Sequence, residues 1–387
     1  MIENRITPMV REELSDEARE ILDLWSGGRK EPKNIFKVYF KNELLNNNWS
    51  VMAGHLFFKN SLTSRQREII VLRITWRCRS DYEFINHLEI ARNRKLMSED
   101  EMLDLTRDTT QLAWNREETA LISATNEIAE TTEMSDETWG ILNETLSIPQ
   151  IMDVVMTVGG YTLNSMACNS LTVDIDTEHS RDPGLTPSAE GPVAIKRTVS
   201  KTGASPRVPI AELTSLDGDV AQKVNGALGA TSERNRVLTL AHHPLLLEDW
   251  APISAYVEDK SNLTSSEADL IMLRAFWRYG VVYGFTHAAH HAVARGLEQD
   301  LVDDIPVGSG SSAFDARQKL LLRAVDQLVD GIFIQDDLWT QLREHYSELE
   351  LMDVVFTTGN SYIKSIFLKT FRVQLESGVS AHTAFKN

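Results

Sequence analysis

The chain has 387 residues, of which 42% are hydrophobic and 25% are charged, and its formal net charge at pH 7 is −17. This composition is typical of a globular protein with two units of ordinary domain size, and its acidic surface repels phosphate backbones and anionic lipid, so we expect no nucleic-acid or membrane partner. The N-terminal segment lacks the apolar core of a signal peptide and no apolar run reaches the length of a bilayer span, which predicts a cytoplasmic location.

Apolar residues at helical spacing divide the chain into a series of predicted helices. In the first half we expect helices at residues 15–25, 34–58, 64–79, 81–94 and 152–171, with further helices beginning at Ser98, Asn115 and Ser135. Thr63 and Gln66 have the spacing of a capping box, in which two side chains bond the free amides of a helix start. Ser80 and Glu83 have the same spacing. No segment alternates like a strand between turn residues, so the predicted fold class is all-α.

The stretch at residues 62–96 returns about 200 positions later, at residues 263–297. Five pairs of identical residues stand in register: Leu62/Leu263, Arg73/Arg274, Trp76/Trp277, Tyr82/Tyr283 and Phe84/Phe285. The sequence MDVV, at Met152 and again at Met352, extends the repeat to the end of each copy. This internal repeat predicts two tandem helical bundles packed as a pseudo-twofold pair.

A segment rich in Pro, Gly, Ser and Thr separates the two copies and shows no periodicity, which is typical of a linker. We therefore expect a first domain at residues 1–176, a linker at 177–205, a second domain at 206–378 and a C-terminal tail at 379–387.

The two copies differ at four polar positions. The first copy has Glu68, Ser80, Glu83 and His87, and the second has Asp269, Val281, Gly284 and Ala288 in their places. Because the second copy keeps the apolar frame and lacks the titratable set, we expect any catalytic site to be confined to the first copy.

The pattern E-x11-S-x2-E-x3-H formed by those four residues resembles that of the carboxymuconolactone decarboxylase and alkylhydroperoxidase D (AhpD) superfamily. Glu68 and His87 match the family's Glu and His, whereas its redox members have cysteines at the positions of Ser80 and Glu83. The resemblance covers nearly the whole chain as two copies, and it implies AhpD-like helical bundles that assemble into a homo-oligomer. It also implies that Glu68 hydrogen-bonds His87 across a pair of helices.

His87 is the main candidate for proton transfer, because an unperturbed imidazole titrates near neutral pH and can both give and take a proton. An ionised Glu83 one turn earlier would favour the imidazolium and make His87 the acid. Each residue also has a structural interpretation: a satisfied core histidine for His87, a capping residue for Glu83 and a surface residue for Glu68. Ser80 reads as a helix cap rather than a nucleophile, since no triad-like pattern accompanies it.

Four residues are candidates for substrate binding: Ser80, Tyr82, Trp76 and His55. Tyr82 and Trp76 recur in the second copy, which favours a packing role for both. His55 aligns with Tyr256 and could line a pocket.

The remaining histidines and the two cysteines suggest no cofactor. His287, His290 and His291 have the spacing of one helix face, which could suit a metal, but no carboxylate follows at a ligand offset and we interpret them as a polar interface. The doublet at His242 precedes a proline and reads as a helix start. Cys78 and Cys168 form no C-x2-C, so we expect two buried, reduced thiols, no metal and no cofactor.

These observations favour a cofactor-independent enzyme that uses His and Glu for acid–base chemistry on a small organic substrate containing a carbonyl or lactone group. Decarboxylation, isomerisation, dehydration and cyclisation all remain open. An alkylhydroperoxidase-like antioxidant is the competing enzyme class, which the missing cysteine pair argues against. A non-catalytic binding or scaffold protein is the third possibility, and the lack of a cavity beside His87 would favour it.

Overall fold

The computed structural model describes residues 5–26, 32–176, 195–200 and 203–385. Within these ranges the regular secondary structure is helical and no strand occurs, so the all-α prediction is confirmed. None of the described helices combines the length and apolar character needed to cross a bilayer.

The helices of the first half are α1 (Asp16–Ser26), α2 (Asn34–Tyr39), α3 (Glu43–Gly54), α4 (Ser64–Arg77), α5 (Asp81–Asn93), α6 (Glu99–Asp104), α7 (Arg116–Thr131), α8 (Asp136–Thr145) and α9 (Ile148–Ser170). Those of the second half are α10 (Gly218–Gly229), α11 (Arg234–Leu240), α12 (Pro244–Asp259), α13 (Ser265–Tyr279), α14 (Val282–Ala294), α15 (Gln299–Asp303), α16 (Ala316–Gly331), α17 (Asp336–Arg343) and α18 (Glu348–Thr370). A single π-helical turn, His55–Lys59, continues α3. Short 3-10 turns lie at Arg11–Glu13, Leu213–Ser215, Gly308–Gly310 and Thr383–Phe385.

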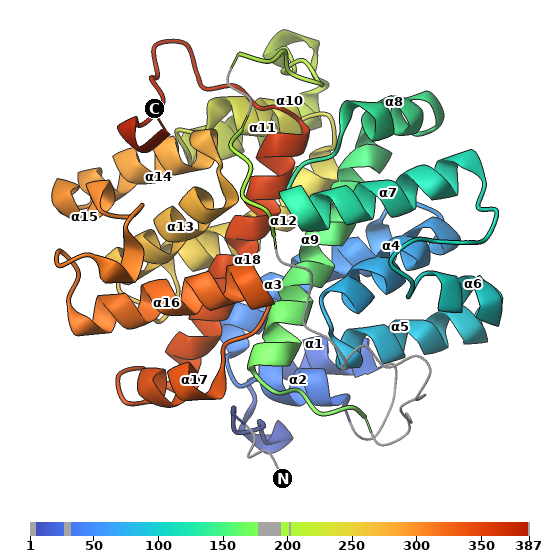
Figure 1. The fold of residues 1–387 in the computed structure, drawn as a ribbon, viewed down its shortest axis with the longest axis horizontal. Coiled ribbons are helices and arrows are strands. Elements are labelled where there is room, and N and C mark those ends of the chain that lie inside the picture. The colour runs from blue at the N-terminus through green and yellow to red at the C-terminus, as the bar shows by residue number, and fades with distance from the viewer. Residues whose placement is uncertain (1–4, 27–31, 177–194, 201–202, 386–387) are drawn as a thin grey trace.

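Helices α9 and α18, of 23 residues each, lie side by side at the centre of the molecule (Figure 1). Glycines let their backbones approach: a Cβ added at Gly359 would lie 2.5 Å from Leu163 Cγ, and one at Gly159 would lie 2.9 Å from Ile366 Cδ1. Helices α4 to α8 lie on one side of this pair and α13 to α17 on the other (Figure 1). The division into tandem domains at the proposed boundaries stays a prediction.

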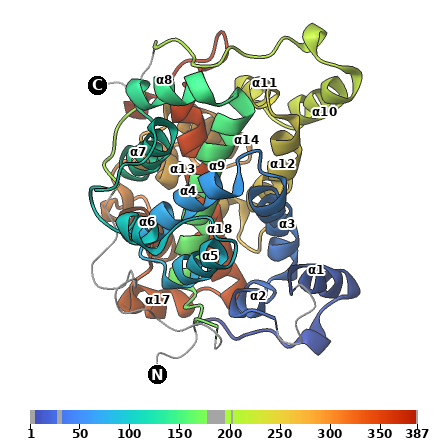
Figure 2. The same ribbon diagram turned by 90° about the vertical axis from the view of Figure 1, so that its right-hand side faces the viewer.

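Helices α3 and α12 form a second contact between the halves, and they run next to one another at one edge of the molecule (Figure 2). The prediction of one helix over residues 34–58 is wrong, because the chain breaks between α2 and α3. Asn42 begins the new helix, and its side-chain oxygen accepts from Leu45 N at 3.2 Å. This break allows α3 to start beside α12.

Helix starts follow the capping signals with one exception. Capping boxes form at Thr63, Ser98 and Asn115, and a further box at Ser147 starts α9 four residues before the predicted start. The box expected between Ser80 and Glu83 does not form, since Ser80 makes no side-chain capping bond. Glu83 is therefore available for another role.

Part of the predicted linker lies outside the described residues, at 177–194 and 201–202. The described parts are 195–200 and 203–205, and residues 195–200 have no regular structure and contact both halves. Lys196 N donates to Glu130 O at 2.6 Å, and Ser200 N donates to Gly280 O at 2.8 Å. The tail at 379–385 packs on α14, where Phe385 meets Phe285 with ring centroids 5.4 Å apart.

The close approach of α9 and α18 predicts that Gly359→Ala destabilises the protein. The new methyl overlaps Leu163 near its backbone, and overpacking of this kind costs about 1–3 kcal/mol. Gly140 in α8 is exposed and has nothing within 4 Å of an added Cβ, so Gly140→Ala should stabilise by roughly 0.5–1 kcal/mol through helix propensity alone. Denaturant unfolding of both variants checks this, and a stabilised Gly359→Ala variant would contradict it.

Candidate functional site

Helices α4 and α5 bring Glu68 and His87 together. The chain reverses between them through Arg79, whose φ of 53° lies in the left-handed region, so that α5 packs back along α4. Glu68 Oε2 lies 2.7 Å from His87 Nδ1, and both side chains are buried. The hydrogen bond across a helix pair that the resemblance implied is therefore present.

Arg67 holds the second oxygen of this carboxylate. Its Nε and Nη2 donate to Glu68 Oε1 at 3.2 and 3.1 Å. Burial raises the pKa of Glu68, but the opposing effects of His87 and Arg67 are together greater and bring the pKa below its usual value. An ionised carboxylate only accepts hydrogen bonds, so Nδ1 of His87 carries a proton. When His87 is neutral, Nε2 is then its basic nitrogen.

Glu83 faces that nitrogen. Its Oε2 lies 3.8 Å from His87 Nε2, one turn along α5, and the buried Cys168 thiol donates to its Oε1 at 3.7 Å. Burial raises the pKa of Glu83, despite opposing effects from His87, Cys168 and Lys33. An ionised Glu83 would make His87 the acid, whereas burial favours the protonated form of this carboxyl group more strongly than in an exposed glutamate.

A cavity of about 220 Å³ opens beside this pair. Its polar lining includes Lys33, Asn46, Asn86, Asn164, Glu83 and His87, and its aromatic lining consists of Trp25, Phe36, Tyr39, Trp49, Phe57, Phe58, Tyr82 and Tyr161. A largely apolar wall with a few convergent polar groups is typical of a small-molecule site.

Aromatic rings hold the imidazole in place. Tyr161 of α9 meets His87 edge to face with centroids 4.8 Å apart, and Phe57 of the π turn approaches at 6.2 Å. The carbonyl of Phe57 also accepts from Arg67 Nη1 at 2.9 Å. The π turn therefore fixes both a wall of the cavity and the arginine that holds Glu68.

The four predicted binding residues have different positions. Tyr82 lines the cavity, and its hydroxyl donates to Asp176 at 2.9 Å. Trp76 does not line it and packs on Phe84 with centroids 5.2 Å apart. Ser80 does not line it either, and its buried hydroxyl has no hydrogen-bond partner among the described residues.

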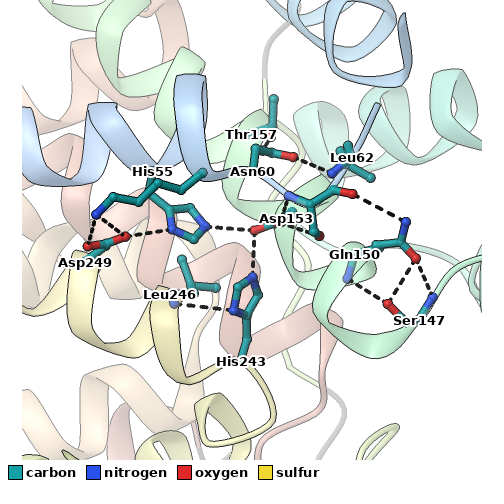
Figure 3. Close-up of polar contacts among 12 residues, drawn as sticks. His55, Asn60, Leu62, Ser147, Gln150, Asp153, Thr157, His243, Leu246 and Asp249 are labelled. Carbon is teal, nitrogen blue, oxygen red and sulfur yellow. Dashed lines mark hydrogen bonds and ion pairs between the residues drawn. The ribbon is translucent and has the colours of Figure 1, made fainter. Parts of the chain in front are cut away.

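His55 also lies outside the cavity wall. It is fully buried between Asp153 and Asp249, with each ring nitrogen 3.0 Å from a carboxylate oxygen (Figure 3). The prediction that His55 lines the pocket is therefore wrong. Its alignment with Tyr256 gave no indication that this position lies between the two halves of the molecule.

The corresponding region of the second half is occupied by other side chains. A Cβ at Gly284, the counterpart of Glu83, would lie 2.9 Å from Phe276 Cδ1. Nearby, the buried Lys364 pairs with Glu233 at 3.2 Å and with Glu258 at 3.0 Å. A glutamate at position 284 would require Phe276 to move. In this region, packing of Phe276 and the ion pairs of Lys364 take the place of the polar groups found beside the cavity.

The other sequence candidates have structural contacts. His287 lies 2.7 Å from Glu376 and 3.2 Å from Ser232, within the second half, whereas His290 and His291 are exposed. His243 caps α12, as the helix-start interpretation required, but it also reaches Asp153.

Both cysteines are buried free thiols, as expected. Burial raises the pKa of the Cys78 thiol to about 11 and raises that of Cys168 as well.

Sequence reasoning missed much of the cavity wall. Tyr161 and Asn164 are both on α9, far along the chain from the motif that ends at His87, and Trp25 is on α1. No local pattern connects these segments with α5. Arg67 was also missed, and its position next to Glu68 in the sequence was the signal that could have indicated it.

Comparisons with known proteins give a limited result. No protein-family model matches the chain, and no curated protein matches it. Among solved structures, the chain is similar to the alkylhydroperoxidase AhpD core of an uncharacterized peroxidase-related protein from Ralstonia eutropha. The identity is 19% and the TM-score 0.39, over 45% of this chain and 94% of that chain.

The buried carboxyl group predicts that Glu83→Gln changes the pH dependence of stability. Burial raises the pKa of Glu83 in the folded state, so its contribution to stability is fully present below the pKa of the unfolded chain and is lost as pH rises through the folded pKa. Because Gln cannot ionise, the difference in unfolding free energy between variant and wild type should shift in favour of the variant as pH rises above about 4.3, the pKa of an unperturbed glutamate. Denaturant unfolding at several pH values measures this difference.

A matched control is Glu137. Like Glu83 it lies in the first turn of a helix, but its side chain is exposed on α8, whereas that of Glu83 is buried on α5. Glu137→Gln should follow the wild-type pH dependence. If Glu83→Gln also follows it, Glu83 is not held neutral by its surroundings.

Proposed function

We propose that the first half of the chain is a cofactor-independent enzyme that transfers protons to and from a small organic substrate bearing a carbonyl or lactone group. The observation that carries this proposal is the order of groups at the cavity: an ionised Glu68 on Nδ1 of His87, and Nε2 of the same ring facing a carboxyl group whose pKa is raised. A base and an acid 3.8 Å apart in a largely apolar pocket suit concerted proton transfer.

The proposed roles follow from the protonation states. His87 Nε2 takes a proton from carbon next to the substrate carbonyl, and Glu83 gives its proton to the carbonyl oxygen, which forms an enol. When the proton returns from His87 to another carbon and the enol proton goes back to Glu83, the result is isomerisation. When the same carbon carries a carboxylate, CO₂ leaves in place of the proton, its bonding pair forms the same enol, and a proton taken up from solvent through His87 completes decarboxylation at that carbon. Glu68 and Arg67 act as positioning residues, because they fix the ring and hold the proton on Nδ1.

The cavity supports a small, largely apolar substrate. Its volume of about 220 Å³ lies below the roughly 300–1,000 Å³ of sites for drug-sized ligands. Aromatic rings cover much of the wall, and Lys33 adds a positive charge that suits a substrate carboxylate or enolate. We propose a cyclic keto acid or unsaturated lactone as the substrate class.

Thiol-based peroxide reduction is less well supported. A reactive cysteine needs a lowered pKa and access to solvent, whereas burial raises the pKa of both Cys78 and Cys168. Neither thiol lines the cavity. A purely non-catalytic role loses support for a different reason, because a cavity does open beside His87.

The first functional prediction is that His87→Ala removes the proton-transfer activity. The measurement is deuterium exchange at carbon next to the carbonyl, followed by NMR in D₂O with a panel of cyclic keto acids and lactones. Loss of a general base lowers rates by about 10²- to 10⁴-fold. Glu83→Gln should lower the rate less, because water can replace an acid more readily than the base.

His287→Ala is the matched control, since His287 is also buried on a helix beside a glutamate but lies in the second half. It should keep the wild-type exchange rate. Fluorescence of Trp25 and Trp49, which line the cavity, separates loss of binding from loss of chemistry. If His287→Ala abolishes exchange and His87→Ala does not, the site lies in the other half.

The second functional prediction is that the double variant Cys78→Ser, Cys168→Ser keeps full exchange activity. Ser at position 168 can still donate to Glu83, so the change removes thiol chemistry and retains the polar contact. Circular dichroism confirms folding of the variant. A folded double variant without turnover would contradict this prediction and favour thiol-based chemistry instead.

A further inference from the structure

A second cluster of ionisable groups lies outside the cavity, at the contact between the two halves. His55 Nε2 and His243 Nε2 lie 3.0 and 3.1 Å from the same oxygen, Asp153 Oδ1 (Figure 3). These three ligand atoms lie within 4.8 Å of one another, and all three residues are buried. His55 and Asp153 belong to the first half, and His243 is the N-cap of α12 in the second.

Further groups orient two of the three side chains. Asp249 Oδ2 lies 3.0 Å from His55 Nδ1, on the far side of the ring, and Lys59 donates to both oxygens of Asp249. The other oxygen of Asp153 accepts from the backbone and hydroxyl of Ser61 at 2.7 and 2.6 Å. A carboxylate behind a histidine and hydrogen bonds to a ligating carboxylate are the usual outer supports of a metal site.

The corresponding position in the repeat lacks this ligand set. There Asp353 Oδ1 accepts from Tyr256 at 2.8 Å and from Asn42 at 3.2 Å. Asn42 is the N-cap of α3, as His243 is of α12. Hydrogen bonds through Tyr and Asn are therefore enough to join the halves at one position, and they do not account for two imidazoles at the other.

We propose that His55 Nε2, His243 Nε2 and Asp153 Oδ1 bind one divalent transition-metal ion of the zinc type, with a fourth position for water. Two imidazoles and one carboxylate suit zinc, and binding displaces the ring protons that otherwise lie against Asp153. His243 then carries a proton on Nδ1 and gives up its contact with Leu246 N, which at 3.4 Å is the longest hydrogen bond of the cluster. From the sequence we expected no metal. The three ligands come from distant segments, so no spacing within one segment indicates this site.

The ion has a structural role in this proposal. None of the three ligands lines the cavity beside His87, so substrate does not reach the ion from there. The bound ion would fix His55 at the start of the π turn, which also contains Phe57. The site is independent of the chemistry proposed at His87.

The test uses the full-length protein, treated with a chelator and then titrated with Co²⁺ as a spectroscopic probe. We expect one equivalent to bind, with the visible absorption bands of a low-coordinate Co²⁺ site, and Zn²⁺ to displace it. His243→Asn places in the site the residue that serves as N-cap in the repeat, so it should fold and lose Co²⁺ binding. Asp249→Asn removes an outer support and should weaken binding by about 10- to 100-fold.

Asp353→Asn is the matched control, because Asp353 is the counterpart of Asp153 in the cluster that lacks histidine. It should bind Co²⁺ like the wild type. Zn²⁺ should also raise the melting temperature of the wild type and of Asp353→Asn but not that of His243→Asn. If the wild type binds no Co²⁺, or if His243→Asn binds it equally well, the cluster is a hydrogen-bonded contact only and the proposal is wrong.

Discussion

The packing of α9 against α18 is the constraint on which the rest of the molecule depends. The glycines at 159 and 359 let the two backbones approach closely. The outer faces of the two helices then place polar side chains against the helices around them. Helix α9 supplies Asp153 to the cluster between the halves and Tyr161 to the wall of the cavity, and α18 supplies Lys364. A change in the separation of these helices would therefore move both polar sites together.

Buried charge is handled differently in the two halves. In the second half, the buried Lys364 is held between two glutamates. In the first half, Glu68 has Arg67 and His87, whereas the hydrogen bond to the Glu83 side chain among the described residues comes from a thiol, and the imidazole lies 3.8 Å away. A buried carboxyl group that is left without a strong partner costs stability, and such groups gather where proton transfer is useful.

The sequence was informative where chemistry is local and less so where it is assembled from distant segments. Glu68 and His87 lie on neighbouring helices, and the hydrogen bond that the family resemblance implied between them is present. The S-x-x-E spacing at Ser80 fits a cap and an inward-facing glutamate equally well, and the burial that decides between them comes from α9. The partners of His55, Asp153 and Asp249, come from α9 and α12, and no spacing within one segment could indicate them.

The second half contributes to the first through this same cluster. His243 and Asp249 come from α12 and contact Asp153 and His55, which begins the π turn. Two residues further on, the carbonyl of Phe57 accepts from Arg67, and Arg67 holds the carboxylate that orients His87. A continuous series of contacts therefore runs from α12 to the imidazole. The second half, which has other residues in place of Glu68, Ser80, Glu83 and His87, thus fixes the turn that supports Glu68 and His87 in the first.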